Sequence, residues 1–513
     1  MAISQVAFAL LLAVAGTVFL WALNRAVQTL APRLPYPPGP PSRGLISGNK
    51  ADVSVPWLWR VCADWGKIYG DILYLRVSNR PVIILNSLKD AIELLEKRSQ
   101  NYSSRPITPM HTLMGFTFAT EMRQYTPEWR KHRRILQQTF KPEATTTYRP
   151  IQTQKMHDAL YALLTSPKDI EEHIRTYAGS IILSITYGYD VAPKNDHLVG
   201  ILESTRIAFS QGQSPKWMIN TFPFLRHVPS WLPGAGFQRY AVSIKKILAE
   251  QREAPFKYTT NVLASGSARV SMISTILENC QSEEDVTMLK EAAAAVYGAG
   301  VGTTSSTVMV FFIAMITYLD IQKKAQDEID RVVGGDRLPN YDDQPSLPYI
   351  TAVLRETLRW QPHVPLGVPH ATEEDDTYKG YHIPKGSIVY PNIWAMTRDP
   401  ERYENPENFN PDRFLDENGR LNDDDVGYTF GFGRRICPGR HLGYATAWLA
   451  IATILSTFDI GKPKDASGNE QPLDVKYTDS GLVSYPLAFD FSIIPRSDRA
   501  RQLILEAHEV ESS

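Results

Sequence analysis

The hydrophobic pattern begins with an uncharged stretch at the start of the chain. No charged residue occurs from Ala2 to Leu23, and the stretch is rich in Leu, Val, Ala and Phe. A helix of this length covers about 30 Å of hydrocarbon, so residues 1–24 are predicted to form a transmembrane anchor. A cleaved signal peptide is the competing interpretation, but no basic residue precedes the apolar run. The first charges, Arg25 and Arg33, follow it, which predicts a cytosolic position for the rest of the chain.

A second uncharged stretch runs from Ala292 to Leu319 and is also long enough to cross a membrane. Its first half contains Gly298, Gly300 and Gly302, followed by a run of hydroxyl residues that starts with Thr303-Thr304-Ser305-Ser306. Small residues of this kind favour the close approach of a flat group more than contact with lipid. We therefore expect a long helix through the protein core.

The rest of the chain is expected to form a stiff hinge and one domain. Residues 25–45 contain Leu34-Pro-Tyr-Pro-Pro-Gly-Pro-Pro41, in which fixed proline dihedrals prevent a helix. No low-complexity linker or repeat follows, so residues 46–513 are predicted to be a single domain dominated by helical periodicity. Short β-rich pieces are expected at Ile72–Val77, Val82–Leu85, Thr377–Ile383 and Ile388–Pro391, the last two around a Lys385-Gly386 turn.

Composition narrows the possible functions. The chain is 43% hydrophobic, and its 54 basic and 55 acidic residues nearly cancel, so no overall field favours binding to nucleic acid. Three cysteines, Cys62, Cys280 and Cys437, lie too far apart in the sequence for a metal-binding pair, and their odd number argues against a disulfide framework. This usage suits a reducing compartment. Cys62 and Cys280 are interpreted as small buried hydrophobic residues.

Cys437 lies in the most specific motif of the chain. The segment Phe430-Gly-Phe-Gly433-Arg-Arg435-Ile-Cys437-Pro-Gly439 fits FxxGxRxCxG at every fixed position. Glycines allow a sharp turn and a close approach to a planar ligand, and a cysteine thiolate is a ligand for iron. The competing interpretation is a buried cysteine in a glycine-rich turn, because a motif is a hypothesis until its context agrees.

Two further motifs supply that context. Glu356-Thr-Leu-Arg359 places a carboxylate and a guanidinium on one helix face, and Phe409-Asn-Pro-Asp-Arg413 supplies a second arginine. The ExxR pattern alone is a weak signal, but here it lies between the threonine-rich helix and the cysteine loop. With its motifs in this order, the chain resembles the cytochrome P-450 family from the proline-rich hinge to about Pro495.

The resemblance implies a mostly α (α+β) fold, a triangular prism of helices with small β-sheets, plus one N-terminal transmembrane helix. It implies that haem b lies between the helix bearing Thr303 and the loop bearing Cys437, the axial ligand of the haem iron. It also implies that Glu356, Arg359 and Arg413 form a buried structural network whose mutual pairing makes burial tolerable.

The resemblance also extends to the contacts with haem. Trp129 and Arg133, four residues apart, share one helix face, and in the family this pair donates to a haem propionate. Arg435 can hold a propionate, and Phe430 can cover the sulfur. Arg105 and His370 are expected to contact a propionate as well. The competing interpretation of Arg105 is a surface charge, and that of His370 is a buried histidine whose hydrogen bonds are made within the core. The expected cofactor-binding set is Trp129, Arg133, His370, Arg435, Arg105, Phe430, Gly433 and Gly439.

The expected partners follow from the same resemblance. A monooxygenase of this family uses dioxygen and electrons from an NADPH-cytochrome P-450 reductase. Segments such as Pro369-His370-Ala-Thr look most like those of fungal microsomal members of secondary metabolism, which implies a single-pass protein of the endoplasmic reticulum membrane. A basic surface could receive the reductase, although a charge cluster is usually a solvated face. Its members would be Arg130, Lys131, Arg134, Arg434 and Arg440.

The substrate is expected to be a hydrophobic small molecule of terpenoid or aromatic polyketide type. Family likeness gives a mainly apolar set of contacts, each of which could equally be plain core. The set is Phe116, Phe118, Val296, Leu366, Val368, Leu482 and Val483. The segment from Phe222 to Trp231 is expected to contact the bilayer interface.

One position departs from the family pattern. Gly302 stands where an acid normally precedes Thr303. We expect Thr303 to assist oxygen activation and water beside Gly302 to carry protons, whereas a glycine that only loosens the helix is the competing interpretation. The departure leaves a reductase-independent haem-thiolate isomerase or dehydratase open as the second function. A non-catalytic haem protein is the third, and no residue pattern favours it.

Overall fold

The computed structural model describes residue 16 and residues 34–44, 47–78, 80–192, 195–212, 216–465, 467–478 and 482–512. Apart from Gly16, the predicted anchor and the first part of the hinge lie outside these residues. The described chain is mostly helical with small β-sheets, which confirms the predicted fold class at that level.

The helices of the first half precede the long core helix. They are α2 (Lys50–Val53), α3 (Leu58–Tyr69), α4 (Leu88–Ala91), α5 (Ser99–Tyr102), α6 (Pro109–Met114), α7 (Pro127–Phe140), α8 (Pro142–Thr146), α9 (Arg149–Thr165), α10 (Ile170–Tyr187), α11 (His197–Gly212), α12 (Met218–Thr221), α13 (Gly236–Ala264) and α14 (Met272–Leu277). The helices of the second half are α15 (Glu283–Thr317), α16 (Leu319–Val332), α17 (Pro348–Trp360), α18 (Ile393–Met396), α19 (Arg440–Thr457) and α20 (Asp498–Ser512).

Helix α15 is the uncharged core helix that the sequence predicts. It is 35 residues long, and Ser282 caps its N-terminus by accepting a hydrogen bond from the Asp285 amide at 3.1 Å. Within the described residues it is the one helix apolar enough to cross a membrane, with a mean hydropathy of 1.7 over its most apolar window. Because 61% of that window is buried inside the protein, packing accounts for its composition.

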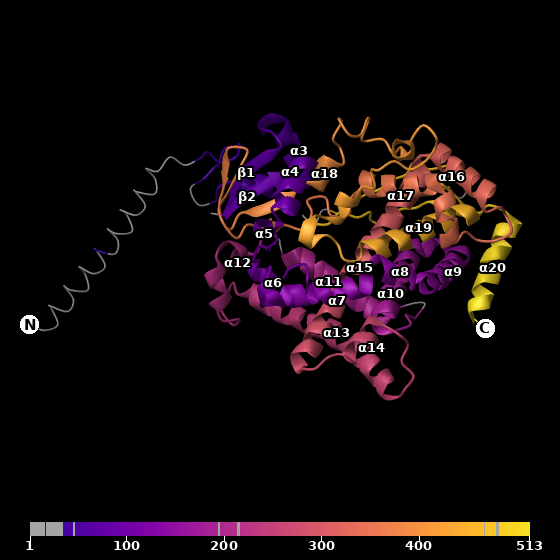
Figure 1. Cartoon of the computed structure of the whole chain (residues 1–513), viewed down its shortest axis with the longest axis horizontal. Helices are drawn as coiled ribbons and strands as arrows, with labels where there is room; N and C mark the ends of the chain where they lie inside the picture. The colour runs from indigo at the N-terminus through magenta and orange to yellow at the C-terminus, as the bar shows by residue number, and fades with distance from the viewer. Residues whose placement is uncertain are drawn as a thin grey trace, which may run out of the picture.

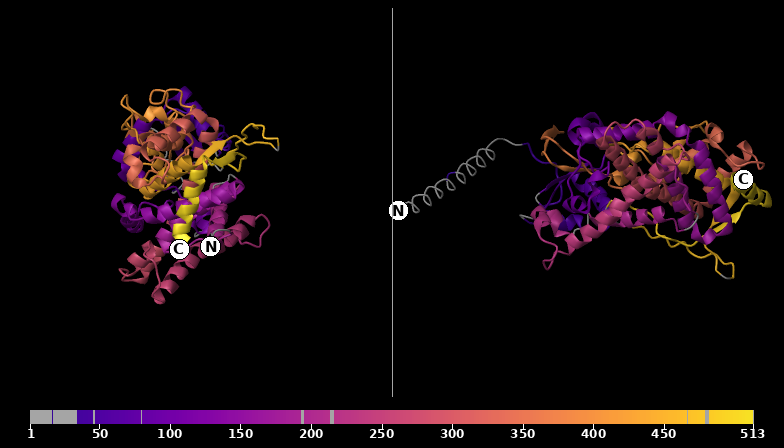
Figure 2. Two further views of the ribbon diagram at one scale, coloured as in Figure 1. Left: turned by 90° about the vertical axis from the view of Figure 1, so that its right-hand side faces the viewer. Right: turned by 90° about the horizontal axis from the view of Figure 1, so that it is seen from below.

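The core is built around the contact of α15 with α10. Fourteen of the eighteen residues of α10 are buried, and they pack with the apolar second half of α15 in the largest hydrophobic cluster. Figure 1 places the strands β1 and β2 at one end of the body and α20 at the other, and Figure 2 shows α20 along the outside of the molecule. Helix α20 packs against α9, where His508 stacks on Tyr161 with ring centroids 4.0 Å apart.

The strands form one small sheet and two hairpin-like pairs. They are β1 (Ile72–Val77), β2 (Arg80–Leu85), β3 (His370–Ala371), β4 (Asp376–Tyr378), β5 (Tyr381–Ile383), β6 (Ile388–Pro391), β7 (Phe458–Gly461) and β8 (Ser492–Pro495). The four-stranded sheet has the order β1-β2-β6-β3, with β6 parallel to β2 and antiparallel to β3. The pairing of His370 with Val389 fixes the position of His370 in the sheet.

The predicted strand piece at 377–383 was wrong in one respect. It is a hairpin of β4 and β5 that turns at Lys379 and Gly380, which have φ values of 49° and 79°. The Lys385-Gly386 turn does not pair β5 with β6, because these strands belong to different sheets. A single strand pattern over seven residues hid a turn that requires left-handed backbone at two positions.

Candidate active site

An internal cavity of about 340 Å³ gathers most of the predicted site residues. It lies between α15, α7, the segment that follows α17, and the cysteine loop. Thr303 and Cys437 are both on its wall. Seven residues of the predicted cofactor-binding set also line it, namely Trp129, Arg133, His370, Arg435, Arg105, Phe430 and Gly439.

The cysteine loop is held tightly by its backbone. The Cys437 amide donates a hydrogen bond to the Phe430 carbonyl at 2.8 Å, which closes the turn between them. Gly433 has φ of 50°, and a Cβ there would lie 2.4 Å from the Leu95 carbonyl oxygen, so only glycine fits. Gly439 has φ of −86° and no heavy atom within 4 Å of an added Cβ. The turn argument therefore applies to Gly433 and not to Gly439, which borders the cavity.

The cavity wall carries three buried or half-buried guanidinium groups that bond only backbone carbonyls. Arg105 donates to the carbonyls of Glu121, Val368 and Pro369 at 2.8–2.9 Å. None of the three forms an ion pair among the described residues. The carbonyl partners of Arg435 are those of Ser103, Thr120 and Arg123, and the partner of Arg133 is the Ile436 carbonyl at 2.6 Å.

The burial of these cations shows in their pKa values. Burial, followed by repulsion from Arg105 and Arg133, lowers the pKa of Arg435 to about 8. Burial lowers the pKa of Arg105 to about 9 and also lowers the pKa of Arg133. Three cations at the wall of one cavity, without carboxylate partners, are costly alone and are stabilised by a ligand that carries negative charge.

Trp129 and His370 complete this side of the cavity. The Arg435 guanidinium lies over the Trp129 ring, 4.2 Å from its centroid, and Trp129 is held at the start of α7 by the Thr126 cap. His370 bonds the Tyr102 carbonyl through Nδ1 at 2.7 Å, so Nδ1 carries the proton and Nε2 is an acceptor. Burial, followed by the charge of Arg105, holds the pKa of His370 well below its usual range. His370 is therefore neutral.

The two residues predicted to activate oxygen face different cavities. Thr303 lies on the wall of the Cys437 cavity, and its hydroxyl donates to the Ala299 carbonyl one helical turn earlier, at 3.1 Å. Gly302 lies instead on the wall of a smaller cavity on another side of α15. The nearest atom to a Cβ added at Gly302 is Cδ of Arg206, at 3.8 Å. The expected water beside Gly302 would therefore lie in this smaller cavity and not in the cavity that Thr303 lines.

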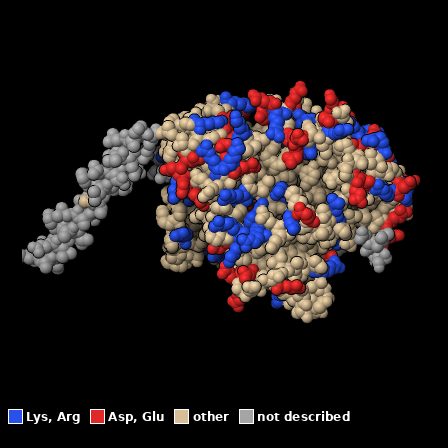
Figure 3. Space-filling model, viewed as in Figure 1, with Lys and Arg blue, Asp and Glu red and all other residues tan. Residues whose placement is uncertain are grey.

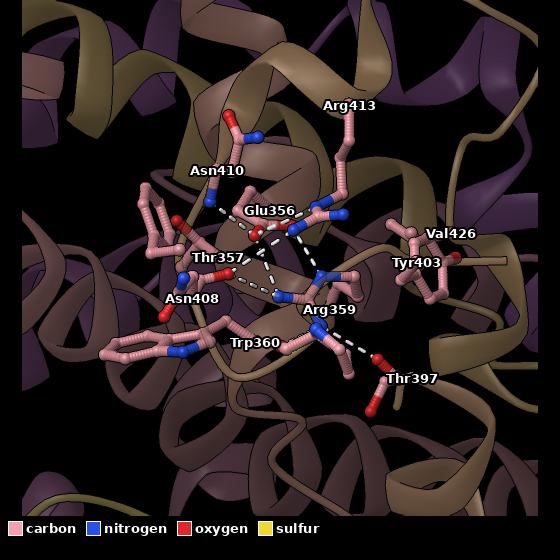
Figure 4. A network of polar contacts seen from close by, with 12 residues as sticks. Glu356, Thr357, Arg359, Trp360, Thr397, Tyr403, Asn408, Asn410, Arg413 and Val426 are labelled. Carbon is pink, nitrogen blue, oxygen red and sulfur yellow. Dashed lines mark hydrogen bonds and ion pairs between the residues drawn. The ribbon is translucent and has the colours of Figure 1, made fainter. Parts of the chain in front are cut away.

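The three residues predicted to form a structural network do contact one another (Figure 4). Glu356 accepts from Arg359 through both carboxylate oxygens, at 2.6 and 2.8 Å, and from Arg413 at 3.3 Å. The Asn410 amide adds a fourth bond at 2.7 Å. Arg359 is fully buried and donates further to the carbonyls of Thr397, Pro406 and Asn408. The cluster thus joins α17 to the loops that follow α18 and lies outside the Cys437 cavity.

The cavity on the side of α15 is mostly apolar, but not through all the predicted residues. Val296 and Val368 line it, together with Ala295, Ala299 and Val364. Phe116 and Phe118 belong to a separate hydrophobic cluster with α6 and α13, and Leu366 packs against Trp59 and Trp394. Leu482 and Val483 are not among the lining residues either. Among the predicted substrate contacts, only those on α15 and directly after α17 line this cavity, because side-chain direction could not be obtained from a pattern without regular period.

The predicted basic surface is exposed but partly neutralised. Blue side chains gather near the middle of the face in Figure 3, in the region where Figure 1 places α7. Lys131 pairs with Glu284 at 2.9 Å, and Arg130 and Arg434 both lie over the ring of Tyr125. The positive charge that remains available on α7 comes mainly from Arg130 and Arg134.

The polar residues of the cavity that sequence analysis missed include Glu121, Gln361 and His363. Gln361 and His363 directly precede the segment 364–368, in which Leu366 and Val368 were expected to contact substrate. The sequence therefore indicated their approximate position in the fold but not that their side chains face the cavity. Nothing in the sequence pattern singled out Glu121. Burial raises the pKa of its carboxyl group.

The residues present fit the haem b that the motifs imply. A planar dianionic ligand supplies the negative charge that Arg105, Arg133 and Arg435 lack, and Cys437 supplies a soft donor for iron. Burial raises the pKa of the Cys437 thiol, while the charges of Arg133 and Arg440 oppose that effect.

Comparison with known proteins agrees with this donor set. The profile of the family described as Cytochrome P450 matches residues 37–483. The chain is 40% identical over 496 residues to the cytochrome P450 monooxygenase COX1 of Coprinopsis cinerea, which covers 93% of this chain and 95% of that protein. It is 39% identical over 478 residues to the cytochrome P450 monooxygenase ple1 of Rhodocybe pseudopiperita, with 91% of each chain covered. It is 38% identical over 475 residues to claR of Ampulloclitocybe clavipes, over 91% of this chain and 88% of that one. The chain therefore belongs to the cytochrome P450 family, whose members bind haem and act as monooxygenases.

Proposed function

We propose that this enzyme inserts one oxygen atom of dioxygen into a hydrophobic small molecule, with Cys437 as the axial ligand of the haem iron. The observation that carries the proposal is the placement of Cys437 on the wall of a cavity with three guanidinium groups that lack carboxylate partners. Haem b, when bound, supplies the redox chemistry of dioxygen. The overall reaction consumes substrate, dioxygen, NADPH and one proton, and it yields oxygenated substrate, water and NADP⁺.

The side chains of the cavity have separate tasks in this proposal. Arg105, Arg133 and Arg435 hold the two cofactor carboxylates, and Trp129 and His370 help to orient them. Phe430 keeps water from the sulfur of Cys437, since a thiolate in a dry setting remains a strong electron donor. The Thr303 hydroxyl donates a hydrogen bond to the Ala299 carbonyl. In this proposal the same hydroxyl can also form a hydrogen bond with a ligand in the cavity.

The proposed partners are a reductase, a membrane and a substrate of secondary metabolism. P450 monooxygenases use a redox partner, and here we assign this role to an NADPH-cytochrome P-450 reductase that docks on α7 and the cysteine loop. Residues 1–24 anchor the chain in the endoplasmic reticulum membrane, residues 25–45 form the hinge, and residues 46–513 form the cytosolic haem domain. Phe224 and Trp231, whose exposed fractions are 68% and 77%, support a further contact with the membrane.

The apolar wall of the cavity supports a terpenoid or an aromatic polyketide as substrate. Val296, Val364 and Val368, which line the same cavity as Thr303, are apolar and favour an uncharged, hydrophobic ligand. Expression with a reductase in a host that carries candidate precursors, followed by comparison of metabolites, identifies the molecule that is oxidised.

Replacement of the proposed ligand tests the function. Cys437→Ser is expected to abolish the red-shifted Soret band of the reduced, carbon monoxide-bound protein, because serine offers a harder and more basic oxygen ligand. The absorption spectrum is the measurement, and Cys62→Ser is the matched control because Cys62 lies in a separate apolar cluster. Survival of the band in Cys437→Ser would show that another residue holds the iron.

A second candidate function, a haem-thiolate isomerase or dehydratase, is kept by the glycine at position 302. Such an enzyme needs no outside electrons and no protons for cleavage of dioxygen. Thr303→Ala separates the two, since a monooxygenase that depends on this hydroxyl should release more hydrogen peroxide per NADPH consumed. An unchanged ratio of peroxide to NADPH removes Thr303 from the mechanism and favours the isomerase.

A further inference from the structure

Three neighbouring cavities share wall residues, and the innermost of them is the Cys437 cavity. The outer one, of about 410 Å³, is bordered by charged residues of α10 and the turn before it, including Lys168, Glu171 and Glu172. The middle one, of about 70 Å³, shares Glu171, Arg175 and Met309 with the outer one. Since neighbouring cavities share wall residues, the three lie next to one another in a row, separated by those residues.

The middle cavity borders position 302, which has no side chain. Gly302 lies on its wall, and no atom is closer to an added Cβ than Arg206 Cδ at 3.8 Å. Its walls are mixed: Ser305, Ser306 and Tyr485 lie on them among apolar residues such as Leu202, Val301 and Met309. A space of about 70 Å³ holds about two water molecules, and the hydroxyl groups offer them hydrogen-bond partners.

His363 stands at the junction of the middle cavity and the Cys437 cavity, because it lines both. Its backbone is fixed by the Ser484 amide, which donates to the His363 carbonyl at 2.9 Å. Its Nδ1 is shielded from water and has no hydrogen-bond partner among the described residues. Burial, followed by the charge of Arg206, lowers the pKa of His363 to about 4, so the ring is neutral. The other charged groups around the middle cavity are Glu171 and Arg175, which pair with each other at 2.5 Å.

The chemistry requires such a route. Insertion of one oxygen atom releases the other as water, so two protons and two electrons must reach each dioxygen. The residue before Thr303, which would be suited to deliver them, is a glycine. We propose that the row of cavities is a water-filled proton route in which Glu171 is the outer acid, Gly302 leaves the gap, and His363 holds the innermost water beside the Cys437 cavity. This inference rests on the proposed monooxygenase function.

In this route protons move along water, and the side chains keep their charge over one cycle. The Glu171 carboxylate takes a proton from bulk solvent and passes it to the water in the outer cavity, which returns it to its ionised state beside Arg175. The neutral ring of His363 orients the last water by a hydrogen bond, so it is a positioning residue. The ring is neither oxidised nor reduced during the cycle.

The test uses the full-length enzyme with a reductase and no added substrate. Dioxygen then leaves either as hydrogen peroxide, after two electrons and two protons, or as two water molecules, after four of each. We expect a larger share of NADPH electrons in hydrogen peroxide for Gly302→Val, His363→Phe and Glu171→Gln, because proton supply is slowed. His363→Asn keeps a water-binding group and should restore part of the wild-type ratio. Gly335→Val and His382→Phe, at positions outside the three cavities, are the matched controls.

A second measurement needs no turnover. Hydroxyl-radical footprinting of the resting protein reports the access of water to side chains. We expect His363 to be labelled faster than the buried Tyr297 in the wild type, and labelling of His363 to fall in Gly302→Val.

The outcomes separate the two proposals. If the wild type gives the carbon monoxide-bound band and consumes NADPH, but the peroxide share stays unchanged in Gly302→Val and His363→Phe, the proton route is overturned and the proposed function stands. If the wild type gives neither the band nor NADPH consumption, the proposed function fails. If a variant does not fold, slow labelling of His363 in the wild type overturns the route by itself.

Discussion

His111 is a buried histidine outside the active site that should make the fold sensitive to acid. It lies in α6, stacks on Phe209 with ring centroids 4.7 Å apart, and bonds the Phe209 carbonyl through Nε2 at 2.8 Å. Its Nδ1 is buried without a partner. Burial lowers the pKa of His111 to about 4, against the weaker effect of the carbonyl bond.

The sign of the effect follows from the two pKa values. Between pH 6.5 and pH 4 the unfolded chain binds a proton at His111 and the folded chain does not, so the free energy of unfolding falls as the pH is lowered. From pH 7 to pH 5 the loss is about 2 kcal/mol. His111→Gln keeps a donor for the Phe209 carbonyl and removes the titration. Denaturant unfolding at both pH values should show a loss smaller by this amount in the variant, and equal losses would contradict the assignment.

Within α15, Gly300 and Gly302 are separated by one residue, and the addition of a methyl group at each should change the free energy of unfolding in opposite directions. A Cβ at Gly300 would lie 2.7 Å from Ile182 Cδ1 of α10, whereas one at Gly302 would lie 3.8 Å from Arg206 Cδ. Gly300→Ala is therefore expected to lower the free energy of unfolding by about 1–3 kcal/mol through overpacking. Gly302→Ala is expected to raise it by up to about 1 kcal/mol through helix propensity.

Thermal unfolding of the haem-bound protein measures this contrast. The two variants serve as controls for each other, because both add one methyl group to the same helix. Equal melting temperatures would show that Ile182 moves away at little cost and that the α10 contact is not tight at Gly300.

Elements with a regular pattern were predicted well, and side-chain directions were not. The strands at Ile72–Val77 and Ile388–Pro391 have the predicted bounds, because apolar β-branched runs bounded by turn residues leave little choice. The long uncharged segment is a core helix, as its glycines and hydroxyl residues indicated. The β3, β7 and β8 strands are short and set by tertiary pairing, which one sequence does not encode locally.

The site shows the same division. The motif residues around Cys437 share a cavity because their identities are tied to their chemistry. Gly302 and Thr303 face different cavities, because consecutive residues of a helix point about 100° apart, and the sequence pattern did not show which cavity each residue lines. The role of His363 could not be found from the sequence, because a lone histidine after a helix carries no pattern.

For the whole molecule, removal of the N-terminal segment should change location more than folding. The core lies around α10 and α15, far along the chain from residues 1–24. Deletion of residues 1–24 is therefore expected to leave the carbon monoxide-bound band intact and to weaken association with membranes. Phe224, Trp231 and Met218, each more than half exposed, should leave some association.

Sedimentation with membranes, followed by the absorption spectrum of each fraction, checks this expectation. Replacement of Phe224 and Trp231 by serine in the shortened chain should reduce the remaining association. Loss of haem on truncation alone would mean that residues 1–24 contribute to the folded domain.

The three guanidinium groups at the cavity wall also bear on how the protein is made. Before the cofactor binds as proposed, Arg105 and Arg133 repel Arg435 in a partly dehydrated space, and burial lowers the pKa values of all three. A newly synthesised chain therefore closes this region against electrostatic resistance that only the cofactor removes. The yield of intact protein in a producing cell should be limited by the supply of haem precursor during synthesis, and haem added after cell lysis should recover little of the chain that has already been degraded.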